Sequence, residues 1–284
     1  MFGQTNSAAK VWFLAAPSRG FGVEMVRQLL ASGNSVVAIG GDGVEALAAL
    51  PEAGERLRVM AIDITDPVQI EAAVEATVAR FGRIDVLVNN AAVGALGAVE
   101  EADDAEICRA VDANLMTLWR VTRAVLPVMR ARRAGRIVNL STLASAARGA
   151  GWGAFEALQA AIEALSDTLA IETGPLGIEV TTVQPVPFRA DIPAGAVIVA
   201  KTQIADYYDT AGRARRRYGV MSPRSVSDPV TGVTAVITAV NAPAPPRHLA
   251  LGHEEFYRTL KKLEDRRAEH MAWRDLSLAM DHML

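Results

Sequence analysis

The stretch VWFLAAPSRGFG, residues 11–22, decides the fold. It opens with a short apolar run that predicts a buried strand, and it continues into a tight turn that ends at Gly20 and Gly22. A helical pattern begins directly after this turn. The order predicts a strand, a glycine turn and a helix as the first unit of an α/β fold.

The same alternation repeats along the chain. Apolar runs predict strands at 35–39, 57–62, 84–88, 136–140 and 178–183, and helical periodicity predicts helices at 66–81, 103–133 and 153–173. Strands that are apolar throughout are buried on both faces, and the repeated strand–helix order joins them by right-handed crossovers. The sequence therefore predicts a single domain over residues 1–284, an α/β Rossmann-like doubly wound parallel sheet of about seven strands.

The last third of the chain interrupts this alternation. Residues 188–222 are rich in Pro, Gly and charge, which predicts a lid or substrate loop above the carboxyl ends of the strands. A helix near 226–240 and a short strand at 248–251 are predicted next. Residues 252–284 are predicted as a C-terminal helical extension, with a charged helix at 254–273.

Composition limits the partners of the protein. The 284 residues are 51% hydrophobic and 21% charged, with a net charge of −3, which argues against a nucleic-acid-binding surface. No apolar run reaches the roughly 18 residues that a membrane helix needs. Cys108 is the single cysteine, the chain start does not look like a secretory leader, and the four histidines lack metal-ligand spacing. We expect a cytoplasmic protein that binds no metal, nucleic acid or membrane.

Polar residues recur at fixed places after the predicted strands. They are Ser18 and Arg19 in the first turn, then Asp63, Asn89, Asn114 and Ser141. Together with the glycines of the first turn and the sequence FEALQ at 155–159, their order and spacing resemble the short-chain dehydrogenase/reductase family over roughly residues 10–277. The resemblance implies a dinucleotide at the first turn and a proton relay near Ser141.

The chain departs from the family pattern at the dinucleotide. Gly20 and Gly22 match the last two glycines of the motif Thr-Gly-x-x-x-Gly-x-Gly, whereas Ala15 and Ala16 replace its threonine and first glycine. No acid or arginine ends the second strand to select NAD or NADP. We interpret the remaining family positions as a vestigial cofactor site, made of Ser18, Arg19, Gly20, Gly22, Asp63 and Asn89.

The departure is larger at the catalytic segment. The family pattern is a serine, then Tyr-x-x-x-Lys, completed by an asparagine. Ser141 and Asn114 remain here, but Phe155 and Gln159 take the places of the tyrosine and the lysine. A general acid contributes roughly 10²–10⁴-fold in rate, so we expect ordinary carbonyl reduction to be nearly absent. Ser141, Asn114, Gln159 and Phe155 are predicted as a catalytic site, in which Ser141, Asn114 and Gln159 supply neutral hydrogen bonds.

A largely apolar substrate pocket is predicted around this site, and three hypotheses follow. The pocket residues are Leu143, Trp152, Gln184, Phe188, Tyr207 and Tyr208. The preferred hypothesis is an enzyme that requires no cofactor and performs a non-redox cyclase, isomerase or lyase reaction on a small molecule, for instance in secondary metabolism. The second is a non-catalytic protein that binds a ligand or partner. The third is an NADP-dependent oxidoreductase with Tyr207 or Tyr208 as a substitute acid. In each case, helices 103–133 and 153–173 are expected to form a homodimer or homotetramer.

Overall fold

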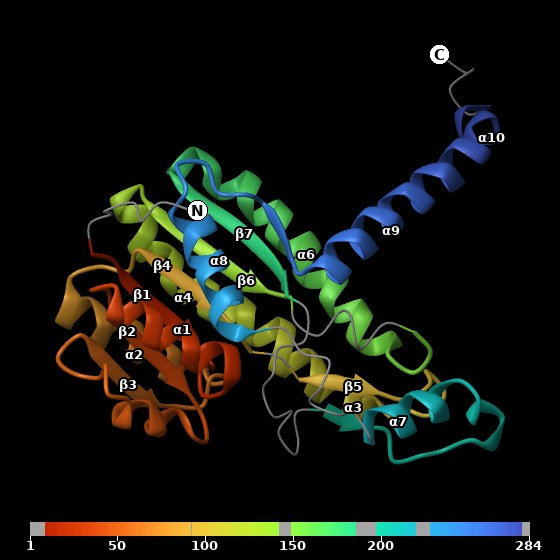
Figure 1. Cartoon of the computed structure of the whole chain (residues 1–284), viewed down its shortest axis with the longest axis horizontal. Coiled ribbons are helices and arrows are strands. Elements are labelled where there is room, and N and C mark those ends of the chain that lie inside the picture. Colours follow the sequence, from red (N-terminus) through yellow and green to blue (C-terminus); the bar gives the residue numbers. More distant parts are fainter. Residues whose placement is uncertain (1–8, 92, 142–148, 186–196, 220–227, 280–284) are drawn as a thin grey trace.

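A seven-stranded parallel sheet forms the centre of the computed structural model (Figure 1), which describes residues 9–91, 93–141, 149–185, 197–219 and 228–279. Its strands lie in the order β3-β2-β1-β4-β6-β7-β9. Their bounds are β1 (Val11–Ala15), β2 (Ser35–Gly40), β3 (Leu57–Ala61), β4 (Val86–Asn89), β6 (Gly135–Leu140), β7 (Ile178–Pro185) and β9 (His248–Leu251). All neighbouring pairs are parallel. The predicted fold class is confirmed.

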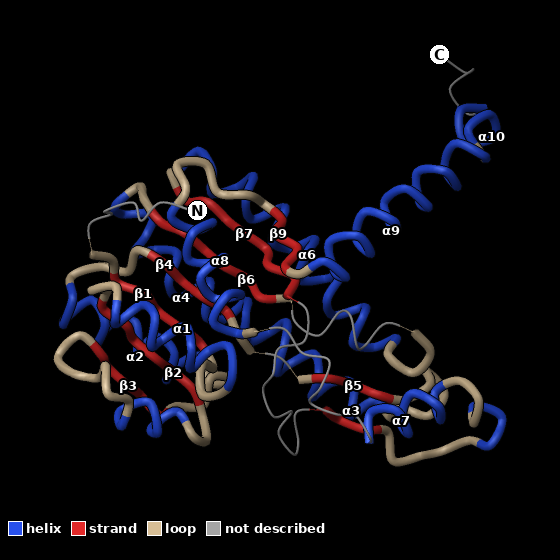
Figure 2. Tube along the Cα trace, viewed as in Figure 1, coloured by secondary structure: helices blue, strands red, loops and turns tan. Residues whose placement is uncertain are grey.

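Helices cover both faces of this sheet (Figure 2). The helices have the bounds α1 (Gly20–Ala31), α2 (Pro67–Phe81), α3 (Asp104–Val111), α4 (Thr117–Arg132), α6 (Gly153–Thr173), α7 (Ala211–Gly219), α8 (Pro229–Asn241), α9 (His253–Ala272) and α10 (Arg274–Leu278). Alternate residues of β1 explain the two layers. Trp12 and Leu14 pack on one face with α1 and α8, whereas Phe13 and Ala15 pack on the other with α2, α4 and α6. Successive strand residues point to opposite faces, so an apolar run buries both sides of the sheet.

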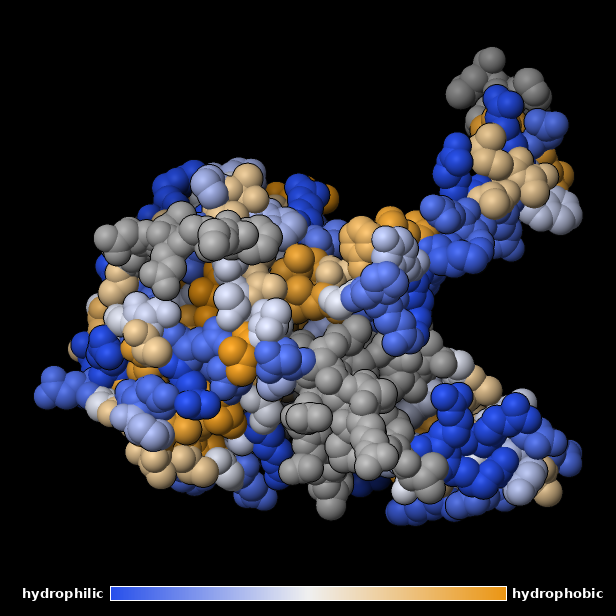
Figure 3. Space-filling model, viewed as in Figure 1, coloured by the Kyte–Doolittle hydropathy of each residue, from blue (hydrophilic) through white to orange (hydrophobic). Residues whose placement is uncertain are grey.

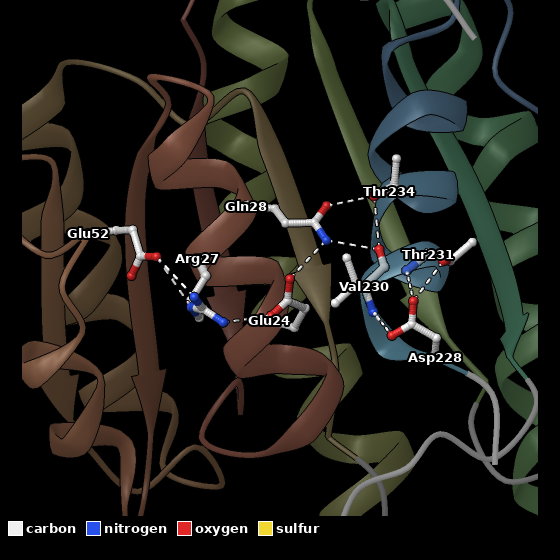
Figure 4. A network of polar contacts seen from close by, with 8 residues as sticks. All are labelled: Glu24, Arg27, Gln28, Glu52, Asp228, Val230, Thr231 and Thr234. Carbon is white, nitrogen blue, oxygen red and sulfur yellow. Dashed lines mark hydrogen bonds and ion pairs between the residues drawn. The ribbon is translucent and has the colours of Figure 1, made fainter. Parts of the chain in front are cut away.

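A polar network ties α1 to α8 (Figure 4). Gln28 of α1 donates to the Val230 carbonyl at 2.9 Å and accepts from the Thr234 hydroxyl at 3.0 Å. Asp228 caps α8 by accepting from the backbone amides of Val230 and Thr231. These contacts place the beginning of α8 beside α1, the helix that follows the first turn.

One predicted helix is wrong in detail. The pattern at 103–133 predicts one continuous helix, but the structure has α3, a π-helical turn over Asp112–Met116, and then α4. The start of α3 follows from a capping box in which Asp103 and Glu106 each accept from the other's backbone amide. π-Helical turns inside helices are frequent at functional sites.

A small second sheet stands outside the main one. Strands β5 (Gly94–Leu96) and β8 (Val197–Val199) pair in parallel, and α7 packs nearby. Arg215 of α7 makes a bidentate ion pair with Glu101, whose side chain is fully buried and also accepts from the Ala98 and Ile204 amides. The second lobe, made of β5, β8 and α7, contains the described part of the predicted lid. Residues 186–196 and 220–227, and with them Phe188, lie outside the described residues.

Residues 253–278 form a helical arm, made of α9 and α10. It projects away from the body of the molecule (Figure 1). The charged helix predicted at 254–273 is α9, shifted by one residue. Among the helices in the described ranges, none combines the length and apolar character that a bilayer crossing requires.

Candidate functional site

The turn between β1 and α1 is held from two sides. Ala16 adopts a left-handed backbone with φ of 57°, donates its amide to the Ile39 carbonyl at 2.8 Å, and accepts from the Asn90 side chain at 2.7 Å. A left-handed alanine is strained, so the neighbouring strands must hold it there. The turn therefore keeps, with an alanine, a backbone conformation that glycine would adopt freely.

Gly22 is required by the packing of this turn. A Cβ on Gly22 would lie 2.5 Å from the Pro17 Cα, which is closer than real contacts allow. Gly20 begins α1 with φ of 46°, and Ser18 and Arg19 lie just before it, half-buried and exposed respectively. Backbone amides at a helix N-terminus bind phosphate groups, so the turn has the geometry to receive a pyrophosphate.

A shallow cavity of about 440 Å³, broadly open to solvent, lies at the carboxyl ends of β2 and β3. Its walls are Gly41, Asp42, Glu45, Ala61, Ile62, Asp63, Ile64 and Gln69. Asp63 accepts from the Thr65 hydroxyl at 2.7 Å and from the Thr65 amide at 2.8 Å, and both bonds lower the pKa of Asp63. The sequence reasoning identified Asp63 but missed Asp42 and Glu45. The family carries its cofactor-selecting residue at the end of the second strand, where this chain has Gly40 and Gly41, and Asp42 follows directly.

Ser141 and Gln159 form a buried hydrogen-bonded pair. Ser141 follows β6, Gln159 lies on α6, and the serine hydroxyl donates to the amide oxygen at 2.7 Å. Their exposed fractions are 1% and 5%. The Ser141 amide donates to the Val183 carbonyl, which fixes the serine at the end of the sheet. Besides this oxygen, the Gln159 amide carries two N–H donors.

Phe155 lies one helical turn before Gln159 and is fully buried. It packs with Leu96, Trp152 and Val197, and its ring meets the Trp152 ring edge-on at 6.1 Å. Tyr218 of α7 lies against the other side of Trp152 at 6.2 Å, and burial raises the pKa of the Tyr218 hydroxyl. The structure thus joins the predicted Phe155 and Trp152 with a tyrosine that sequence reasoning missed. Leu143 lies outside the described residues.

Asn114 lies on the π-helical turn, and its side chain forms hydrogen bonds with backbone groups. It accepts from the Val93 amide and donates to the Val93 and Ala110 carbonyls, all at 2.8–2.9 Å. This arrangement anchors the start of β5 to the helix. The Asn89 side chain also joins separate elements, because it donates to Asn139 of β6 and to Thr122 of α4. Both asparagines join elements around the site.

Gln184 lies next to Ser141 and faces the same helix. The register Leu140↔Val183 places Ser141 and Gln184 side by side at the ends of β6 and β7. Gln184 donates to Glu163 of α6, one turn beyond Gln159. Another turn further, Asp167 meets His248 of β9 at 2.9 Å. One stripe of α6 therefore makes polar contacts with three neighbouring strands, β6, β7 and β9.

Tyr207 and Tyr208, which were predicted to line the substrate pocket, make their contacts away from the Ser141–Gln159 pair. The Tyr207 hydroxyl donates to Glu100 at 2.8 Å, and this contact raises the pKa of Tyr207. Tyr208 is 61% exposed and lies under the Arg216 guanidinium, 3.9 Å from the ring centroid. Neither hydroxyl has a contact with the Ser141–Gln159 pair. Within the described ranges, no group of three or more His, Cys, Asp or Glu residues could hold a metal ion.

Comparisons with known proteins assign the family. The short chain dehydrogenase model matches residues 10–196, and the chain therefore belongs to the short-chain dehydrogenase family. It is 32% identical to Oxidoreductase BOA17 of Botryotinia fuckeliana over 95% of this chain and 98% of that protein. It is 33% identical to a 3-alpha-(or 20-beta)-hydroxysteroid dehydrogenase of Mycobacterium tuberculosis over 62% of this chain and 68% of that protein.

Solved structures agree with this assignment. A short-chain dehydrogenase from Streptomyces avermitilis, 32% identical, superimposes with a TM-score of 0.85 over 96% of this chain and 99% of that one. An actinorhodin polyketide ketoreductase variant solved with NADPH, 26% identical, gives a TM-score of 0.69 over 86% and 95% of the two chains. The matches to the Botryotinia and Streptomyces proteins cover 95% and 96% of this chain. They therefore include at least part of the arm.

The prediction that no cofactor is required is wrong. The family match, the oxidoreductase relative and the ketoreductase solved with NADPH all point to a nicotinamide dinucleotide. The physical reason for the error lies in the turn, because Ala16, which replaces the family's first glycine, still adopts a left-handed backbone there. The comparisons favour the third hypothesis, an oxidoreductase, over the preferred non-redox one.

Proposed function

We propose that the protein is an NAD(P)-dependent oxidoreductase that interconverts a carbonyl and an alcohol on a small molecule. The observation that carries this proposal is the first turn, where Ala16 adopts φ of 57° and Gly22 allows the close approach of Pro17. The cavity at the ends of β2 and β3 supports it further, because it lies where an adenosine would follow a pyrophosphate bound at the turn. The residues present therefore fit a dinucleotide.

The chain's own residues would divide the work as follows. The amides at the start of α1 would bind the pyrophosphate, and the cavity containing Asp42 and Asp63 would hold the adenosine. A dinucleotide held there would supply the hydride for the carbonyl carbon. Gln159, oriented by Ser141, would bind the carbonyl oxygen, on which negative charge develops.

The pair can stabilise this charge without an ionisable group. Ser141 donates to the Gln159 oxygen, which leaves the Gln159 N–H donors for the substrate oxygen. Burial of both side chains strengthens such a hydrogen bond, because the local dielectric is low. The proton that completes the alcohol would then come from water. A reaction of this kind is slower than one with a tyrosine acid by roughly 10²–10⁴-fold.

We further propose that the protein prefers NADH to NADPH. Three carboxylates line the cavity, Asp42, Glu45 and Asp63, and no lysine or arginine is among its wall residues. Like charges repel, so a 2′-phosphate placed there would bind less well than a ribose hydroxyl, to which a carboxylate can accept a hydrogen bond. Arg19, in the first turn, is the cation that would bind a 2′-phosphate instead. The affinities of Arg19→Ala for NADH and NADPH, compared with those of the wild type, test whether Arg19 opposes the preference for NADH.

We also propose self-assembly through α4 and α6. Trp119 of α4 and Ile171 of α6 are 48% and 66% exposed, which leaves apolar surface on helices that cover one face of the sheet. Aromatic residues of this kind are enriched in the centres of protein interfaces. The Ser141–Gln159 pair is buried, whereas Trp119 and Ile171 are exposed, so the site and this surface can be occupied together.

Initial rates test the proposed function. NADH oxidation at 340 nm is measured with a panel of aliphatic and aromatic ketones, in the wild type and in Ser141→Ala. We expect a ketone-dependent rate in the wild type that falls at least tenfold in the variant, with the dissociation constant of NADH unchanged. Conversion of a substrate at the same rate without any dinucleotide would contradict the proposal.

A further inference from the structure

The arm presents an apolar stripe to solvent. Phe256, Leu260 and Leu263 recur at spacings of four and three residues, and their exposed fractions are 47%, 40% and 60%. Every described residue from 260 to 279 is exposed. Figure 3 shows apolar and charged surface interleaved along the arm, which stands clear of the body. The body of the same chain therefore does not cover this stripe.

An uncovered helix of this kind lacks the main source of helix stability. Helices in proteins are stabilised chiefly by packing of an apolar face against other parts of the protein. Eight apolar residues of the arm are exposed: Phe256, Tyr257, Leu260, Leu263, Met271, Trp273, Leu276 and Leu278.

Charges around Leu263 specify the partner. The sequence is Lys261-Lys262-Leu263-Glu264-Asp265, two cations before the central leucine and two anions after it. Lys261 and Asp265 pair with each other along the same helix, whereas Lys262 and Glu264 flank Leu263. If two such helices pair antiparallel with their Leu263 residues opposed, Lys262 of each helix lies level with Glu264 of the other. A twofold interface requires this kind of self-complementary surface.

We propose that the arm is the docking surface for the arm of a second copy of this chain, paired antiparallel about Leu263. A lipid surface fits less well. The arm carries six Lys and Arg residues against six Asp and Glu residues, so it has little net attraction for anionic lipid. This interface is separate from α4 and α6 and does not depend on the proposed redox function.

Cross-linking tests the register directly. In a Cys108→Ser background, Leu263→Cys places the chain's single thiol at the proposed centre. We expect a disulfide-linked dimer under mild oxidation, because a twofold axis brings the two thiols within bonding distance. Ala272→Cys lies on the opposite face of α9 and is the matched control, expected to stay reduced. Equal cross-linking of both variants, or of neither, would overturn the proposal.

Mass measurement by light scattering gives a second test on the full chain. Leu260→Glu with Leu263→Glu adds two charges to the stripe, and we expect it to halve the mass of the assembly. Ala268→Glu with Ala272→Glu adds the same charge away from the stripe and should leave the mass unchanged. An unchanged mass in the first variant overturns self-pairing. Sedimentation of the wild type, but not of the stripe variant, with phosphatidylserine vesicles would instead assign the stripe to a membrane.

Discussion

The turn at the start of α1 and the pair at Ser141 show two different ways for a site to depart from its family. At the turn, the residue type changed at Ala16 but the backbone still makes a left-handed bend, braced by Ile39 and Asn90. At the pair, the backbone positions are in place but the groups are neutral. A site built from backbone amides tolerates substitution, whereas a site built from one ionisable side chain does not.

The largest expected effect comes from restoring the ionisable groups. Phe155→Tyr with Gln159→Lys should raise the rate of carbonyl reduction by roughly 10²–10⁴-fold, because the hydroxyl supplies a proton donor and the ammonium lowers its pKa. Stopped-flow measurement of NADH oxidation with a reactive ketone checks the change. The single variant Gln159→Lys is the control and should gain little. No gain in the double variant would mean that the turn at the start of α1 and the site at Ser141 do not bring the dinucleotide and the substrate together for catalysis.

The second effect concerns the lobe that carries β5 and α7. Glu101→Gln should lower the free energy of unfolding at pH 7 by about 3 kcal/mol, because it breaks a buried ion pair and strands Arg215. The hydrogen bonds from Arg215 lower the pKa of Glu101 to about 2 from 4.5. The stabilisation is therefore complete above pH 4.5 and is lost as the pH falls from about 4.5 to about 2.

Urea unfolding at pH 7 and at pH 3 measures this difference. The gap between wild type and Glu101→Gln should be smaller at pH 3. Glu100→Gln, which changes an exposed neighbour, should cost less than about 1 kcal/mol at either pH. A gap that is independent of pH would show that the ion pair is not what holds the lobe.

The third effect separates structure from chemistry at the pair. Ser141→Ala should lower the free energy of unfolding by about 1–3 kcal/mol, because it leaves the buried Gln159 oxygen without a donor. Adding Gln159→Leu should recover part of this loss by removing the unsatisfied group. A double-mutant cycle from urea unfolding gives the coupling energy. Additive effects would indicate that the two residues do not interact.

The smallest effect tests the turn. Ala16→Gly removes a left-handed alanine and its methyl, so the affinity for NADH should rise by a few fold. Stability should change by less than about 1 kcal/mol, because the relief of strain is offset by the greater freedom of glycine in the unfolded chain. Fluorescence titration measures the affinity. A weaker affinity would show that the methyl contributes to binding.

Much of the fold could be predicted because its signals are local. Asp66 before Pro67 gives the cap of α2, and the pattern at 153–173 gives the bounds of α6. The π-helical turn could not be predicted, because it accompanies contacts between Asn114 and Val93, which lie apart in sequence. The strands β5 and β8 are three residues long and pair across about a hundred residues, too short for a periodic signal.

The site was predicted only in part for similar reasons. Ser141 and Gln159 follow from the family spacing, but their mutual hydrogen bond needs the packing of α6 on β6. Asp42 and Glu45 enter the cavity because Gly43, with φ of 84°, turns the chain into a 3-10 helix directly after β2. Tyr218 reaches Trp152 because the Arg215–Glu101 ion pair fixes α7. Each of these depends on contacts between distant segments.

Titration with NADH tests the central claim most directly. We predict saturable 1:1 binding that raises the free energy of unfolding by about 2.7 kcal/mol at 100 times the dissociation constant. Gly22→Val should abolish this binding because its side chain meets Pro17, whereas Gly54→Ala, which points into open space, should not change it. No binding of NADH or NADPH to the folded wild type at millimolar concentration would contradict the account.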